Sequence, residues 1–307
     1  MPFSHHSHSG QFCGHATSTL EAVVQRALAK AMTSLCLTEH IPRDRIDFYP
    51  EEEKDHDEVS LVKLFDDYYA EARRLQRAYK GRLAIFVGFE TEWIREPRSG
   101  EIIRDLMAKY AFDLFVGSVH HVRGLPIDYD TTMYRQARTR CGGRDEDVFH
   151  EYFDAQLGML RALKPPVVGH FDLIRLKSDE PNRSLRSYGD GLWEKVMRSL
   201  RFVASYGGVL EVNSSALRKG LKEAYPSLEI CKECTAMGGR LTLSDDSHGV
   251  EQVGLNYGRA VEGLKEAGVE RVWFLAEGET EDERFEGVRW KAVKMEELEG
   301  HAFWKKS

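Results

Sequence analysis

Short apolar runs rich in β-branched and aromatic residues alternate along this chain with longer segments of helical periodicity. Such alternation is typical of repeated βα units around a parallel sheet, so it predicts an α/β fold. The predicted strands are 2–6, 34–38, 83–89, 113–119, 166–169, 208–212 and 240–244. The predicted helices are 18–30, 60–79, 100–110, 145–163, 190–205, 227–237 and 250–267. A late apolar run, 272–276, fits either an eighth strand or a terminal edge strand.

The chain has 307 residues, a length that one α/β barrel domain commonly occupies. It contains no Pro/Ser-rich linker and no internal repeat beyond the βα alternation, which favours a single domain over 1–307. Two connectors, 42–59 and 124–144, are unusually long. Loops of this length either cover a binding site as a lid or lie on the surface without a function, and the sequence leaves both readings open.

Charge and composition narrow the functional classes. Lys and Arg number 43 against 50 Asp and Glu, a net charge of −7 that disfavours general nucleic-acid binding. No apolar run is long enough for a membrane span, and the N-terminus lacks the pattern of a signal peptide, so we expect a cytoplasmic protein that does not bind membranes. The five cysteines are odd in number, and no second pair accompanies Cys231 and Cys234, which favours free thiols over a disulfide framework or a zinc site.

Residues able to bind a metal follow nearly every predicted strand. They are His6 and His8, His40, Glu90, His120, His170, and Asp246 with His248. If the strands are parallel and close into a barrel, these side chains meet at the carboxyl-terminal rim, where barrel enzymes place their active sites. His15 follows the first strand closely enough in sequence to return to the same rim. The pattern therefore predicts one pocket lined by metal ligands.

Spacing and residue type indicate an open, catalytic site. Because side chains on a strand repeat every two residues, His6 with His8 and Asp246 with His248 can each chelate from one face. Imidazoles and carboxylates without thiolates suit Zn, Mn or Fe, and one carboxylate such as Glu90 can bridge two cations. Seven imidazoles and two carboxylates are about enough for three divalent ions that each keep a position open for water or substrate.

Each of these residues has a simpler interpretation when it is taken alone. A single His or Glu at a strand end is more often a surface residue or a satisfied polar group than a metal ligand. The segment His5 to His8 also resembles a histidine-rich tract. The simpler interpretation fails because ligand-type residues recur at six strand ends in one chain.

The ligand-type residues match in order the motifs of the polymerase-and-histidinol-phosphatase (PHP) superfamily, and the match covers almost the whole chain. The matching motifs are His6-Ser-His8, His15, Thr-Glu-His40, Gly-Phe-Glu90, Gly-Ser-Val-His120, Gly-His170 and Asp246-Ser-His248. Within the superfamily the chain resembles the histidinol-phosphatase branch, especially its fungal members. The more specific pieces are Phe-Cys-Gly-His15-Ala, Gly-Ser-Val-His120-His121, Gly-His170-Phe-Asp172-Leu, Glu211-Val-Asn213-Ser-Ser-Ala-Leu-Arg218 and Ala224-Tyr-Pro226. The resemblance implies a distorted seven-stranded β/α barrel that hydrolyses L-histidinol phosphate to L-histidinol and phosphate in histidine biosynthesis.

The resemblance also implies how three ions would share the ligands. The first would take His6, His8, Glu90 and Asp246, the second Glu90, His120 and His170, and the third His15, His40 and His248. The chain departs from the common Asp-x-His-x-His form of the first strand, because Ser4 stands where an acid often lies. Since that acid would orient the histidines, its absence is expected to weaken or alter metal preference without abolishing the site.

A hydroxide that bridges two of the ions is the expected nucleophile, since metals bring the pKa of bound water close to neutral. The phosphate needs charge-assisted donors besides the ions. The candidates for contacts with the substrate are Arg218 first, then Arg175 and Lys177, with Asn213 and His121 beside them. His121 is also a candidate for proton transfer. The partner of the substrate amine is left open among Asp172, Glu92 and Asp245.

Two other functions compete with this one. A phosphoesterase of the same superfamily could act on another small phosphate ester, a nucleotide, phosphotyrosine or DNA ends. The negative net charge of the chain disfavours DNA. A metal-binding module without turnover is the alternative from another class, because ligands alone do not prove catalysis. Dinucleotide chemistry is disfavoured, since neither the G-x-G-x-x-G nor the P-loop pattern occurs.

Overall fold

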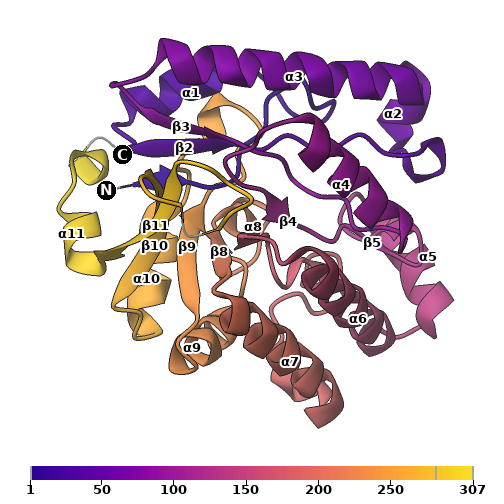
Figure 1. The fold of residues 1–307 in the computed structure, drawn as a ribbon. Helices are drawn as coiled ribbons and strands as arrows, with labels where there is room; N and C mark the ends of the chain where they lie inside the picture. Colours follow the sequence, from indigo (N-terminus) through magenta and orange to yellow (C-terminus); the bar gives the residue numbers. More distant parts are fainter. Residues whose placement is uncertain (1, 281, 306–307) are drawn as a thin grey trace.

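A computed structural model of the chain describes residues 2–280 and 282–305 and has a mixed α/β fold. Its parallel strands form two sheets. One sheet has the order β1 (Phe3–Ser4), β2 (Ser34–Leu37), β3 (Ala84–Val87). The other has the order β4 (Val116–Gly117), β7 (Val167–Val168), β8 (Val209–Asn213), β9 (Arg240–Ser244). All seven correspond to predicted strands, and they lie at the centre of the molecule with helices outside them (Figure 1).

Isolated β-bridges link the two sheets on both sides. Glu90 pairs with Val116 between β3 and β4, and Ser7 pairs with Ser247 between the ends of β1 and β9. These are single bridges rather than continuous ladders, so the described residues contain no closed sheet. The predicted seven-stranded barrel therefore stays a prediction, while the parallel α/β arrangement is observed.

Helices occupy all seven predicted helical segments. They are α1 (Leu20–Ala29), α3 (Glu58–Ala78), α4 (Arg98–Lys109), α6 (Asp145–Leu163), α7 (Asp190–Tyr206), α9 (Leu228–Ala236) and α10 (Tyr257–Glu266). The last one is shorter than predicted, because Gly254 (φ 64°) and Asn256 (φ 62°) take left-handed conformations that no α-helix accommodates. Only a 3₁₀ turn, η4 (Val250–Gln252), precedes that break.

The two long connectors carry secondary structure of their own. The segment 42–59 contains η1 (Arg45–Asp47) and α2 (Pro50–Asp55). The segment 124–144 contains strand β6 (Leu125–Pro126), which pairs antiparallel with β5 (His121–Val122), and helix α5 (Thr131–Cys141). Further short elements follow the strands at η2 (Leu173–Arg175), η3 (Leu185–Tyr188) and α8 (Ser215–Arg218). Both connectors are therefore ordered parts of the fold rather than plain loops.

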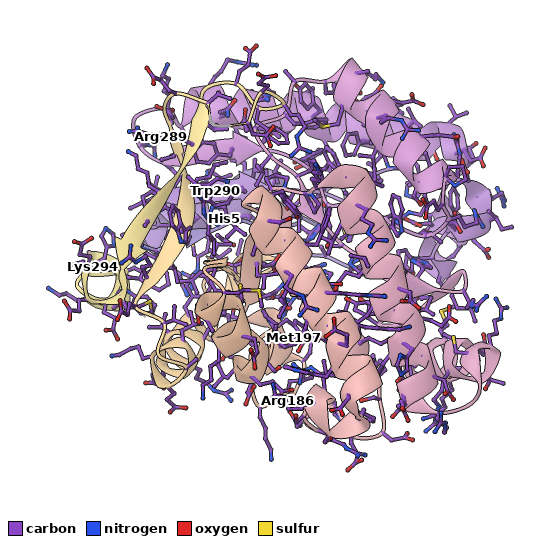
Figure 2. The ribbon with its side chains drawn as sticks, turned by 60° about the horizontal axis from the view of Figure 1, so that its bottom comes forward. His5, Arg186, Met197, Arg289, Trp290 and Lys294 are labelled. Atoms are coloured by element: carbon purple, nitrogen blue, oxygen red, sulfur yellow. The ribbon has the colours of Figure 1, made fainter. Side chains whose placement is uncertain are left out.

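The late apolar run forms a strand outside the two parallel sheets. It lies in β10 (Arg271–Glu277), which pairs antiparallel with β11 (Val288–Lys294), and α11 (Met295–Glu299) and η5 (Ala302–Lys305) follow. The side chain of His5 connects this hairpin to the parallel strands. Its Nε2 accepts a hydrogen bond from the backbone N–H of Leu275 at 3.0 Å, and its ring lies 5.3 Å from that of Trp290 (Figure 2).

The remaining expectations concern membranes and thiols. No helix within the described part of the chain has the length and apolar character needed to cross a bilayer. All five cysteines are free thiols, and Cys231 and Cys234 are buried in the hydrophobic core, in agreement with the sequence interpretation.

Candidate metal centre and active site

The ligand-type residues predicted from the strand ends lie together in the structure. Because the strands are parallel, their carboxyl ends deliver these side chains to one side of the fold. The side chains form overlapping groups whose candidate ligand atoms lie within 4.8 Å of one another. The groups are His6–His8–Glu90, His8–Asp246–His248, His40–Glu92–His120, Glu90–His120–His170 and Cys13–His15–His40–His248. All nine predicted ligand residues occur in these groups.

Glu90 is at the centre of the cluster, and its two carboxylate oxygens face different pairs of histidines. Oε2 lies 3.1 Å from Nε2 of His6 and 3.4 Å from Nε2 of His8. Oε1 lies 3.2 Å from Nε2 of His120 and 2.9 Å from Nε2 of His170. A carboxylate in this position can contribute one oxygen to each of two neighbouring cations.

Asp246 lies on the other side of the first pair of histidines. Its Oδ1 is 3.8 Å from Nε2 of His6, 3.6 Å from Nε2 of His8 and 3.5 Å from Nδ1 of His248. Oδ2 accepts hydrogen bonds from Asn213 Nδ2 at 3.3 Å and Ser215 Oγ at 3.1 Å. The position of Asp246 is therefore fixed by side chains at the end of β8.

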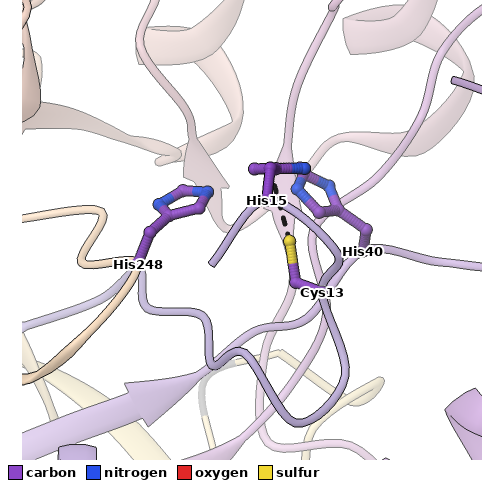
Figure 3. Close-up of side chains that lie close together, drawn as sticks. All are labelled: Cys13, His15, His40 and His248. Atoms are coloured by element: carbon purple, nitrogen blue, oxygen red, sulfur yellow. Dashed lines mark hydrogen bonds between the residues drawn. The ribbon is translucent and has the colours of Figure 1, made fainter. Parts of the chain in front are cut away.

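A third group contains His15, His40, His248 and Cys13 (Figure 3). The ring of His15 lies 5.5 Å from that of His40 and 5.0 Å from that of His248. Cys13 adds a thiol that sequence reasoning did not place in the site, with Sγ 3.3 Å from Nε2 of His15. The Cys-Gly-His spacing was the available signal, since it brings residues 13 and 15 into one turn.

Buried carboxylates orient the histidines from behind. Nδ1 of His6 lies 3.0 Å from Glu211, Nδ1 of His8 lies 3.2 Å from Glu39, and Nδ1 of His120 lies 3.1 Å from Glu92. When Nδ1 donates to a carboxylate, the lone pair of Nε2 is free to bind a metal. The replacement of an acid by Ser4 thus leaves neither His6 nor His8 without a carboxylate partner.

The two carboxylates of the cluster have pKa values that favour cation binding. Burial alone would raise the pKa of Glu90, but attraction to His6, His120 and His40 holds that pKa well below its usual range. Asp246 behaves in the same way: burial opposes ionisation, yet His6, His248 and Lys219 hold its pKa well below the usual range. Both carboxylates are therefore ionised at neutral pH.

Several imidazole nitrogens in the cluster are buried and make no hydrogen bond within residues 2–280 and 282–305. They are Nε2 of His6, Nε2 of His8, both ring nitrogens of His40 and Nδ1 of His170. Burying polar atoms without partners is costly, and buried charges require pairing or a metal. Divalent cations among these nitrogens and the ionised carboxylates would satisfy both requirements, so the residues fit the metal centre that their sequence pattern predicts.

A cavity of about 310 Å³ opens onto the cluster. Its lining includes seven of the nine candidate ligands together with polar residues from neighbouring segments. These neighbours are Tyr49, Asp128, Tyr129, Arg218, Lys219 and Gln252. Arg218 Nη2 donates to the backbone oxygen of Asp246 at 3.0 Å, while its buried Nη1 has no hydrogen-bond partner in the part of the chain that is described. Arg218 therefore offers a free donor beside the candidate ligands.

The other predicted substrate residues do not line this cavity. Arg175 pairs with Asp172 at 2.7 Å and donates to the backbone oxygen of Pro181, and Lys177 is half-buried nearby. Asn213 contacts Asp246, as described above. The ring of His121 packs 5.3 Å from that of Tyr49. Lys219, Asp128 and the two tyrosines of the lining were not predicted, because they come from loops without a strand-end pattern.

Residues 4–215 match the family model described as "PHP domain". The chain belongs to the PHP family. The matched range contains seven of the nine candidate ligands, and Asp246 and His248 lie beyond it.

Several proteins that align with most of this chain are named histidinol-phosphatases. A Saccharomyces cerevisiae protein named histidinol-phosphatase is 36% identical over 83% of this chain and 85% of its own length. A Schizosaccharomyces pombe protein named "probable histidinol-phosphatase" is 44% identical over 91% of this chain and 90% of its own. Among solved structures, histidinol phosphate phosphatase from Lactococcus lactis, complexed with Zn, L-histidinol and phosphate, superimposes with a TM-score of 0.65. That match covers 87% of this chain and 93% of the other at 21% identity, so it supports the shared fold.

Proposed function

We propose that this PHP-family chain is a histidinol-phosphate phosphatase that hydrolyses L-histidinol phosphate to L-histidinol and phosphate, a step of histidine biosynthesis. The relatives at 44% and 36% identity support this reaction. The observation that carries it in the structure is Glu90, whose two oxygens face separate histidine pairs beneath a cavity that also contains Arg218. This arrangement suits a phosphate ester held between cations and a guanidinium.

The site suits about three divalent ions, with Zn, Mn or Fe as candidates. His6, His8, Glu90 and Asp246 would hold the first ion. Glu90, His120 and His170 would hold the second, and His15, His40 and His248 the third. If bound, the ions would polarise the phosphate as Lewis acids and lower the pKa of water, so that a hydroxide nucleophile would be available near neutral pH.

The side chains of the chain have separate tasks in this reaction. Arg218 binds a phosphate oxygen through its unpaired Nη1 and so opposes the charge that develops on the phosphoryl group. Lys219, whose Nζ lies 4.0 Å from Asp246 Oδ2, adds positive charge to the same wall of the cavity. Glu211, Glu39 and Glu92 hold the protons on Nδ1 of their histidines and keep Nε2 directed at the cluster.

The same proposal extends to the architecture. The two parallel sheets and the bridges at both of their edges support a distorted seven-stranded β/α barrel. One hydrophobic cluster runs from Phe3 to Phe303, which supports a single domain over 1–307. A cytoplasmic location fits the biosynthetic reaction.

Steady-state hydrolysis by the metal-replete protein tests the function. We expect kcat/KM for L-histidinol phosphate to exceed that for nucleoside monophosphates and phosphotyrosine by at least about two orders of magnitude. A clear preference for another ester would show that the enzyme acts on a different substrate, while the proposed phosphoesterase reaction would still hold. Metal binding without turnover of any ester would favour a binding module and overturn the proposal.

A further inference from the structure

The substrate class named above is a zwitterion, since a phosphate ester of an amino alcohol carries an ammonium group near its phosphate. Arg218 supplies a donor for the phosphate, but the ammonium needs an acceptor in the same cavity. The three acids considered from the sequence are already engaged elsewhere. Asp172 pairs with Arg175, Glu92 with His120 and Arg43, and Asp245 with Ser4 and the backbone N–H of Gly254. None of these acids is part of the cavity lining.

Asp128 is a carboxylate of the lining that is not in the ligand groups. Its Oδ1 is buried and has no hydrogen-bond partner in the described stretches 2–280 and 282–305. An unpaired buried carboxylate oxygen is costly unless a ligand satisfies it. Arg218 Nη1 is a buried, unpaired donor of the same cavity. The cavity thus offers one free anionic acceptor and one free cationic donor.

The backbone fixes Asp128 beside the candidate metal ligands. The β5–β6 hairpin turns through Arg123 (φ 53°) and Gly124 (φ 72°), and the left-handed conformations of these two residues suit a two-residue hairpin loop. The chain then returns along the strand end that carries His120, because the N–H of Ile127 donates to the backbone oxygen of His120 at 2.9 Å. On the other side, the Asp130 carboxylate accepts from the N–H of Met133 at 2.7 Å and caps α5. Asp128 is held between these two anchors.

Accepting the proposed function, we infer that Asp128 binds the ammonium group of the substrate and so selects phosphate esters of amino alcohols over esters without the amine. The charge on Asp128 and the charge on Arg218 then orient the substrate from its two ends. The ester bond would then lie between them, beside the candidate metal ligands. Asp128 takes no part in bond breaking, so it is a specificity residue.

The test compares Asp128→Asn with the unaltered enzyme on L-histidinol phosphate and on its analogue without the amine, 3-(imidazol-4-yl)propyl phosphate. We expect kcat/KM for L-histidinol phosphate to fall roughly 10- to 100-fold, because a hydrogen bond between charged groups is lost. For the analogue, the change is expected to stay within about threefold, since no ammonium is present. Asp105→Asn, a change at an exposed position of α4, is the matched control and should leave both values unchanged.

Product inhibition supplies a second measurement that does not depend on turnover rates. Inhibition by L-histidinol should weaken in Asp128→Asn by a similar factor, while inhibition by inorganic phosphate should stay the same. Equal losses on both substrates, or no loss on either, would overturn the role of Asp128. If the unaltered enzyme hydrolyses other esters but not L-histidinol phosphate, the proposed function itself fails, and this result is distinct from a failure of the inference.

Discussion

Replacing Glu211 by Gln removes one buried negative charge behind His6 while keeping almost the same shape. Glu211 is fully buried in the middle of β8, and its two oxygens lie 3.2 and 3.0 Å from Nδ1 of His6. The amide of Gln retains one oxygen that can accept from Nδ1, so a hydrogen bond can survive. The charge that favours the required tautomer and strengthens Nε2 as a ligand does not survive.

The expected loss of metal affinity in Glu211→Gln follows from the change from a charged to a neutral hydrogen-bond acceptor. A hydrogen bond to a charged acceptor contributes about 1.5–3 kcal/mol and one to a neutral acceptor about 0.5–1.5 kcal/mol. The difference of roughly 1–2 kcal/mol corresponds to about a 5- to 30-fold weaker metal affinity. Loss of a carboxylate behind a metal-binding histidine typically costs ~10- to 100-fold, which agrees in order of magnitude.

Competition between the apoprotein and a chelating dye for Zn²⁺ measures this affinity directly. Glu211→Gln should show at least one binding step weakened by about tenfold, with histidinol-phosphate turnover restored in part by added metal. Glu262→Gln, a change at an exposed position of α10, is the matched control and should behave as the unaltered protein. Unchanged metal affinity and activity in a folded Glu211→Gln protein would refute the claim that Glu211 prepares His6 as a ligand.

Three further predictions concern the cluster and its surroundings. Glu90→Ala and His248→Ala should each lower histidinol-phosphate turnover by orders of magnitude in steady-state assays, and near-normal turnover in a metal-replete Glu90→Ala enzyme would count against the bridging role. Removing metal with a chelator should lower the unfolding free energy by about 2.7 kcal/mol for each bound ion, relative to protein with metal at 100 times the Kd of that site, seen as a lower melting temperature that Zn²⁺ restores. A melting temperature that does not respond to metal would contradict this. Burial lowers the pKa of His5 to about 4, below the ~6.5 expected in the unfolded chain, so the unfolded state binds more protons between these values and stability falls as pH drops through that window. Urea unfolding at pH 7 and pH 5 should show that His5→Gln loses less stability at the lower pH than the unaltered protein does. An identical loss in both proteins would refute the claim that His5 causes this pH dependence.

The sequence predicts that the candidate ligands lie close together, because this arrangement depends on local rules, and their side chains do cluster in the structure. Parallel strands place their carboxyl ends on one side, and the alternation of side chains puts His6 and His8 on one face, so a strand-end pattern implies convergence without knowledge of the packing. The seven parallel strands and the seven main helices are found for the same reason, since their periodic apolar patterns are long or strongly bounded.

Tertiary contacts limit what the sequence can reveal about the rest of the site. Glu211 meets His6 across 205 positions of sequence, and no local pattern marks that pairing. Asp128 looks like an ordinary loop acid until the β5–β6 hairpin returns it to His120. Conversely, Arg175 looked available for phosphate, but the fold pairs it with Asp172.

Two features of the fold were not predicted from the sequence, and the reasons are similar. The helix predicted over 250–267 kept its apolar spacing, yet the left-handed Asn256 delays its start to Tyr257. Strand β11 exposes much of both faces, with Arg289, Lys291 and Lys294 outside, so its pattern lacked the apolar contrast that marks a strand.

Titration of the apoprotein with Zn²⁺ or Mn²⁺, followed by turnover of L-histidinol phosphate at each addition, tests whether these residues form a catalytic metal centre. We expect negligible hydrolysis without metal and a rise that reaches its plateau near three equivalents, because seven imidazoles and two carboxylates are about enough for three ions. Full activity in the metal-free protein, or no activity at any metal loading, would contradict the assignment of these residues to a catalytic metal centre.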